Sequence, residues 1–374
     1  MLKALKCWPL AGHPANPAGW LFDVARNHAI DGLRREGKQV VLGEDDFLAE
    51  CHTEPAFARE LHDDELRLLF AICHPALPIE AQVALALKAL CGFSLREIAT
   101  GLLTNETALA QRIARARKII TSQQIDLSTP PPEALPARRR AVLATIYLMF
   151  NEGYHSGSNN EVQRKEICME AIALARAMSA HPVSAHAEVH ALAALLLLHG
   201  ARLDARVDAG VGAIGGMLLL PQQPRERWDQ DMIALGMLHL DLARDTDQLT
   251  STHLQAGIAA EHALATSYGQ TNWSAILGLY NTLLLIDQSP VARLGHAVAV
   301  AKVHGTEDGL RLLATLLPAL PKRFPFGLVA QGDWLLELGR TAEARESYLR
   351  ALADAGNDSQ SAFISAKLRT LVST

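Results

Sequence analysis

Four polar side chains are spaced so that they share one side of a helix. Thr107, Gln111, Arg115 and Lys118 recur at intervals of three and four residues, which is the spacing of neighbours on a helix surface. A glutamine has the geometry for paired hydrogen bonds to an adenine edge, and an arginine has it for a guanine edge. The spacing therefore predicts a helix that reads base edges in a DNA groove.

Two helices joined by a tight turn must position these side chains. Ser94 and Glu97 have the spacing of a capping box, in which two side chains satisfy free N–H groups of a first helical turn. We expect this short helix to stop at Gly101 and a longer helix to begin at Thr104 or Asn105. A short helix, a turn and a longer helix form the arrangement that places side chains in a major groove.

The longer helix is two-faced, with basic residues at the borders. Arg112 and Arg117 flank the polar face, where they can reach phosphates. The alternative is an amphipathic helical hairpin with a solvated basic face. The apolar residues of the helix fall within a narrow arc on the opposite side: Leu109, Ile113, Ala116 and Ile120.

The net charge of −5 hides an uneven distribution. Residues 1–43 carry six Lys or Arg against three Asp or Glu, residues 44–80 carry two against ten, and residues 81–121 carry six against two. Two basic segments separated by an acidic one are what phosphate-contacting modules would produce. Aromatic residues make up only 5% of the chain, and Ala and Leu recur throughout, so we expect an all-α protein.

Several function classes are not expected. The longest apolar run, residues 191–198, is far shorter than the roughly 20 residues of a membrane-spanning helix. The first residues lack the apolar core of a secretory signal, so we expect a cytoplasmic protein with reduced thiols. The cysteines form no CxxC pair, and neither a disulfide framework nor a metal site nor a cofactor is predicted. The five cysteines are Cys7, Cys51, Cys73, Cys91 and Cys168.

Residues 16–35, 93–99 and 110–118 together resemble bacterial sigma factors of the extracytoplasmic-function type. The resemblance implies that the protein binds core RNA polymerase and promoter DNA. In that family the first stretch belongs to the domain that reads the minus-ten promoter element. The second and third form the helix-turn-helix that reads the minus-thirty-five element. The resemblance places Arg26, Asn27, Arg34 and Arg35 on the minus-ten DNA, and Thr107, Gln111, Arg112, Arg115, Arg117 and Lys118 on the minus-thirty-five duplex.

The rest of the chain resembles a subgroup of that family with a long helical C-terminal domain. The signature is residues 147–154, and further pieces lie at 225–229, 256–262, 271–273, 279–281 and 289–291. The family's minus-ten domain begins with helices that dock on polymerase, and this chain starts close to Trp8, so we expect only part of that domain. The expected domains are residues 1–42 (partial minus-ten region), 43–61 (acidic linker), 62–121 (helix-turn-helix domain), 122–136 (Pro-rich linker) and 137–374 (helical domain).

Residues 147–154 have two interpretations. They expose Asn151, Glu152 and two tyrosines, Tyr147 and Tyr154, beside a glycine bend, which would suit docking or ligand sensing. The favoured interpretation is structural: Tyr147, Phe150 and Tyr154 are spaced three and four apart and would form a helix core that ends at this point.

Residues 137–374 predict alternating amphipathic helices. Gly339, Ala344, Tyr348 and Ala351 reproduce the second-helix pattern of a tetratricopeptide repeat, in which small residues pack beside one large ring. Such arrays offer a groove for a peptide or protein ligand. The competing hypothesis to a sigma factor is therefore an interaction protein with a residual DNA-binding element and no autonomous sigma activity.

Two other motifs carry less weight, and no catalytic motif points to an enzyme. Residues 210–215 spell GxGxxG, but a helical stretch precedes them where a dinucleotide site needs a strand, so a Gly-rich loop is favoured. His186 and His190 have metal-ligand spacing without the rest of a zinc motif, so a polar helix face is favoured.

Overall fold

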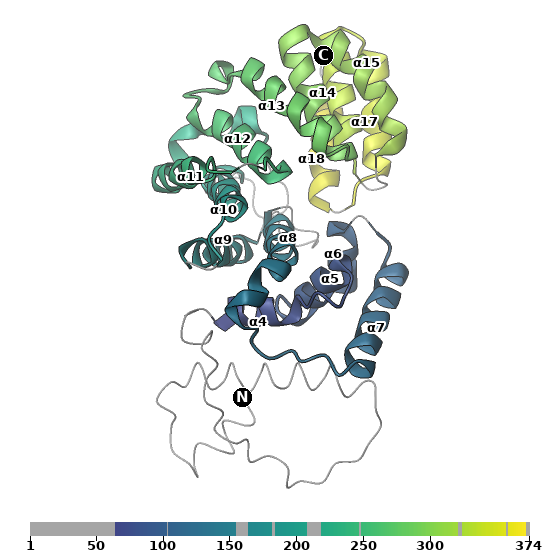
Figure 1. The fold of residues 1–374 in the computed structure, drawn as a ribbon. Coiled ribbons are helices and arrows are strands. Elements are labelled where there is room, and N and C mark those ends of the chain that lie inside the picture. The colour runs from purple at the N-terminus through teal and green to yellow at the C-terminus, as the bar shows by residue number, and fades with distance from the viewer. Residues whose placement is uncertain are drawn as a thin grey trace, which may run out of the picture. The chain divides into compact units, whose positions relative to one another are not determined.

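The computed structural model describes residues 64–102, 104–154, 164–181, 184–207, 218–246, 248–320, 324–356 and 358–371. In these ranges the chain forms α-helices and short 3-10 turns, with no β-strand (Figure 1). The prediction of an all-α protein is therefore confirmed. The partial minus-ten region and the acidic linker expected at residues 1–61 lie outside the described residues.

The chain divides into two compact units. The first comprises residues 1–149 together with 176–185, and the second comprises residues 150–175 together with 186–374. Within the described residues, no helix is both long and apolar enough to cross a membrane.

The first unit contains a small helical domain. Pro78 precedes the second helix, and the first and second helices bury Leu66, Phe70 and Leu85 almost completely. The compact unit extends beyond residue 121, the expected end of the helix-turn-helix domain, into the helix of residues 135–154. Its core therefore includes Val142 and Ile146 as well. The helices of this part are α4 (Asp64–Ile72), α5 (Ile79–Ala89), α6 (Leu95–Gly101), α7 (Glu106–Ser122) and α8 (Leu135–Tyr154), the last preceded by the 3-10 turn η1 (Pro132–Ala134).

The second unit is built from successive helices, most of which pack on their neighbours in sequence. Leu254 and Ile258 of one helix pack with Ile276 and Leu283 of the next and with Val300 of a third. The helices are α9 (Lys165–Ala180), whose last turn belongs to the first unit, α10 (Ala187–Gly200), α11 (Gln230–Leu242), α12 (Ser251–Leu264), α13 (Trp273–Ile286), α14 (Pro290–His304), α15 (Thr306–Leu316), α16 (Phe326–Glu337), α17 (Thr341–Ala353) and α18 (Asp358–Thr370).

The small-residue pattern near the C-terminus has the packing expected of it. Ala344, Tyr348 and Ala351 of α17 are at most 1% exposed. Tyr348 lies so close to Gly332 of α16 that a Cβ there would come within 2.5 Å of the ring. Gly339 adopts a φ of +73°, a conformation that favours glycine, between the two helices. The local packing is confirmed, and the tetratricopeptide assignment stays a prediction.

Candidate nucleic-acid interface

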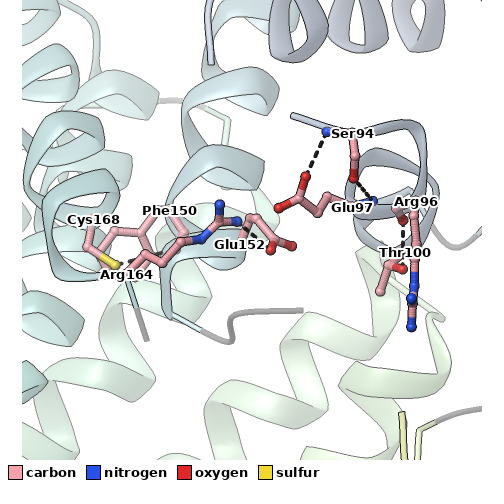
Figure 2. A network of polar contacts seen from close by, with 8 residues as sticks. All are labelled: Ser94, Arg96, Glu97, Thr100, Phe150, Glu152, Arg164 and Cys168. Carbon is pink, nitrogen blue, oxygen red and sulfur yellow. Dashed lines mark hydrogen bonds and ion pairs between the residues drawn. The ribbon is translucent and has the colours of Figure 1, made fainter. Parts of the chain in front are cut away.

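The first helix of the helix-turn-helix begins with the capping box that the sequence predicts. The backbone N–H of Ser94 donates to the Glu97 carboxylate at 2.7 Å, and the backbone N–H of Glu97 donates to the Ser94 hydroxyl at 3.2 Å (Figure 2). Each side chain satisfies a donor that the first helical turn leaves without an intrahelical partner. Helix α6 then ends at Gly101, as expected.

The second helix starts at Glu106, and Asn105 is its capping residue. The Asn105 side-chain oxygen accepts a hydrogen bond from the backbone N–H of Ala108 at 2.7 Å. The helix therefore begins one residue after the later of the two expected starting points, and Asn105 is the residue that caps it. The cap fixes where α7 begins, and so it fixes which side chains face the solvent.

Helix α7 separates an apolar face from a polar face. Its buried residues are the four predicted ones, Leu109, Ile113, Ala116 and Ile120, which are at most 6% exposed. Thr107, Gln111, Arg115 and Lys118 are all exposed. The structure therefore brings the four predicted base-reading side chains together on one free side of the helix.

The border arginines have a different environment. Arg112 and Arg117 are half-buried, because each lies where the buried face meets the solvent. Their aliphatic stems can cover apolar surface while their guanidinium groups stay near the solvent. Among the described residues, Arg112, Arg115 and Lys118 form no ion pair, so their charges are available for phosphates.

One cation of this surface was not singled out from the sequence. Arg96 is exposed on α6, the helix that crosses the DNA backbone in this type of motif. Figure 2 shows its side chain extending away from the Ser94–Glu97 pair. The signal that could have identified it is a basic residue inside a capping box. The predicted minus-ten residues, Arg26, Asn27, Arg34 and Arg35, lie outside the described residues.

The candidate docking motif at residues 147–154 is less exposed than the docking interpretation assumed. Tyr154 and Glu152 are 7% and 9% exposed, and Glu152 forms an ion pair with Arg164 at 2.6 Å (Figure 2). Tyr147 and Asn151 are half-buried. The burial of Tyr154 and of Phe150, which is 1% exposed, agrees with the favoured structural interpretation. The exposure of Glu152 and Tyr154 that the docking interpretation assumed is not found, because the start of α9 packs against the last turn of α8. A docking role for Tyr147, Asn151, Glu152 and Tyr154 stays untested.

The last turn of α8 also explains its glycine. A Cβ on Gly153 would lie 2.8 Å from the Cys168 sulfur and 2.9 Å from the Arg164 carbonyl oxygen. The Gly153 carbonyl accepts a hydrogen bond from the backbone N–H of Arg164 at 2.7 Å. Glycine is therefore required here for the close approach of two backbones.

Two of the described cysteines are buried, and two histidines with metal-ligand spacing have other contacts. Burial raises the pKa of Cys73 and of Cys168 to about 12, so both thiols stay protonated. His186 caps α10, and His190 lies 3.0 Å from His239 between their Nδ1 atoms. The described residues hold no group of three or more His, Cys, Asp or Glu suited to a metal ion. The Gly-rich stretch at residues 210–215 lies outside them.

The comparisons with known proteins match two parts of the chain. Residues 69–120 match the family model described as Sigma-70, region 4, and residues 138–244 match a family of unknown function, DUF6596. The chain is 39% identical to an uncharacterized protein of Rhizobium meliloti (strain 1021), over 98% of this chain and 87% of the relative. No solved structure matches. The sigma-70 region 4 match covers α6 and all but the last two residues of α7, which indicates a DNA-binding, sigma-factor-like domain.

Proposed function

Because the chain belongs to the same family as the Rhizobium meliloti protein and carries a sigma-70 region 4 domain, we propose that it is a sigma factor. It binds core RNA polymerase and directs it to promoters, and α7 reads the minus-thirty-five element. The extracytoplasmic-function type is the class that its sequence resembles. The helical part after residue 137 regulates this activity.

One observation carries the proposal: α7 buries a continuous apolar face and leaves Thr107, Gln111, Arg115 and Lys118 on the opposite side. A helix that is fixed by a cap, held by its core and free on its polar side can enter a major groove without refolding. Uncompensated cations beside that face support binding to phosphates.

The test uses the full chain and core RNA polymerase. Association is measured by co-purification, and the reconstituted enzyme selects promoters from fragmented genomic DNA before run-off transcription from the selected fragments. We expect a stable complex and start sites that share one minus-thirty-five sequence. A chain with Gln111→Ala and Arg115→Ala keeps polymerase binding and loses that shared sequence.

The competing hypothesis predicts a different result. If the protein is an interaction module with a residual helix-turn-helix, it fails to form the complex and no transcript depends on it. That pair of negative results would reject the sigma-factor proposal.

A further inference from the structure

Segments far apart in the sequence meet at Trp228, a residue that the DNA-binding proposal leaves without a role. Trp228 is 3% exposed and follows the 3-10 turn η4 (Arg225–Arg227). The guanidinium carbon of Arg225 lies 4.2 Å from the centre of the Trp228 ring, and that of Arg202 lies 5.6 Å from it. Arg202 also donates to the Tyr154 hydroxyl at 2.8 Å, so the end of α8 belongs to the same cluster.

Arg225 extends the cluster to two further helices. Its Nη1 atom donates to the carbonyl oxygens of His262 and Ala265, the latter at 2.7 Å, where α12 ends. The His262 ring meets Trp273, the first residue of α13, edge to face with 5.3 Å between ring centres. The cluster therefore unites four stretches of the chain that are distant in sequence, around residues 154, 202, 225–228 and 262–273.

Positive charge gathers at this cluster. Arg206 is 5% exposed, and its guanidinium carbon lies 3.4 Å from the centre of the Tyr154 ring. Burial lowers the pKa of Arg206 and of Arg225, and the charge of Arg202 lowers both further. Within the described residues none of these three arginines forms an ion pair. Unpaired cations taken out of water are costly unless an anion joins them.

Buried polar atoms of this part of the chain also lack hydrogen-bond partners among the described residues. Two of them are donors, the Trp228 indole N–H and Nη2 of Arg225. The other two, Nδ1 of His262 and the Thr271 hydroxyl, can donate or accept. Indole and guanidinium groups donate and never accept, so what they lack is an acceptor. Native folds rarely leave such groups unsatisfied, and their concentration points to an absent group.

We propose that the second unit binds an oxyanion, the phosphate or carboxylate group of a small molecule, at Arg202, Arg225 and Trp228. An oxyanion supplies the missing charge and several acceptor atoms at once, and guanidinium groups pair with both kinds of oxyanion through two parallel hydrogen bonds. None of these residues belongs to the DNA-reading face of α7, so the proposal gives the second unit a ligand of its own.

The experiment titrates the full chain at constant ionic strength with inorganic phosphate, pyrophosphate and succinate. Binding is followed by calorimetry and by tryptophan fluorescence. The first two probes test phosphate groups and the third tests carboxylates. We expect one class of probe to bind saturably. Arg202→Gln lowers that affinity by about 10- to 100-fold, the effect of losing a hydrogen bond to a charged group. Trp228→Phe, which keeps an aromatic ring and removes the N–H donor, lowers it less.

Arg227→Gln is the matched control, because Arg227 is exposed and adjacent to Trp228. It should bind as the unmodified chain does, which separates a local site from general attraction of anions. Circular dichroism establishes that each variant is folded, and Trp228→Phe keeps the test decisive if Arg202→Gln does not fold. Absence of saturable binding to all three probes would overturn the proposal, as would equal binding by the unmodified chain and the Trp228→Phe variant.

Discussion

The Arg138 guanidinium donates a hydrogen bond to the carbonyl oxygen of Phe70 at 2.8 Å, and the same nitrogen donates to that of Ala71 at 3.1 Å. These carbonyls lie in the last turn of α4, where a helix has acceptors without intrahelical partners and favours a positive charge. Phe70 lies in the segment that matches sigma-70 region 4, and Arg138 is the first residue of the segment that matches DUF6596. A buried contact therefore joins the two matched segments within the first unit.

Arg138→Met should destabilise the end of α4. The substitution keeps an unbranched side chain of similar length and leaves two carbonyl groups without their donor. We expect a loss of about 2–3 kcal/mol, the usual cost of removing a charged hydrogen-bond partner from a buried site. Hydrogen–deuterium exchange of the amides of residues 66–72 measures this loss locally, as faster exchange.

Arg140→Met is the control, because Arg140 is exposed two residues further along α8. Exchange at residues 66–72 should be the same in this variant as in the unmodified chain. If both variants exchange alike, Arg138 does not hold α4 in place.

The exposed and half-buried arginines of α7 should affect DNA binding differently. Arg115 lies on the exposed face, so Arg115→Ala should cost about 1–3 kcal/mol on the preferred sequence and reduce discrimination between sequences. Arg112→Ala and Arg117→Ala should weaken binding to all sequences and lower the slope of log affinity against log salt by about 1 each. Fluorescence anisotropy over a salt series, with specific and scrambled duplexes, measures both quantities.

Arg345→Ala serves as the control for charge removal, since Arg345 is exposed on α17. Its binding curves should match those of the unmodified chain. A uniform loss for Arg115→Ala, with unchanged discrimination, would show that Arg115 contacts only phosphates.

Local rules predicted the helix-turn-helix well because its signals are close together in sequence. The capping box joins Ser94 to Glu97, and the faces of α7 follow from a spacing of three and four residues. The all-α class followed from composition for the same reason, since helix propensity is a property of single residues.

The cluster around Trp228 could not be predicted in this way. Arg202 and Trp228 meet only in the folded chain, and residue spacing carries no information about such contacts. The burial of Tyr154 depends likewise on Arg202 and Arg206, which follow it by about fifty residues. Residues 225–229 were one of the pieces that resemble the sigma-factor subgroup. That resemblance singled out the segment but did not indicate which residues contact it.

Two glycine-to-alanine substitutions should have opposite effects on stability. In Gly153→Ala the new Cβ would meet Cys168 and the Arg164 backbone within 3.0 Å, which should destabilise the fold by about 1–3 kcal/mol through overpacking. Gly278 is exposed within α13, and a Cβ added there would meet no atom within 4 Å, so Gly278→Ala should stabilise the helix by about 0.5–1 kcal/mol. Urea unfolding followed by tryptophan fluorescence compares them, and a Gly153→Ala variant as stable as the unmodified chain would contradict the close approach inferred at Gly153.

His262 should make the second unit sensitive to acid. Burial lowers its pKa from the ordinary 6.5 to about 4, with the charges of Arg202 and Arg225 acting in the same direction. Between these two values the unfolded chain binds a proton that the folded chain does not, so stability falls as the pH falls from 6.5 to 4. The contribution is at most about 3 kcal/mol, and it is absent above pH 6.5, where His262 is neutral in both states.

His262→Gln removes this group, so the variant should lose less stability than the unmodified chain over that pH range. His304→Gln is the control, because His304 is exposed at the end of α14. Urea unfolding at several pH values, again followed by tryptophan fluorescence, gives the free energy of unfolding for all three chains. The unmodified chain and the His304 variant should show the same acid-dependent loss, and the His262 variant a smaller one. Equal losses in all three would mean that His262 takes up a proton as easily in the folded chain as in the unfolded one.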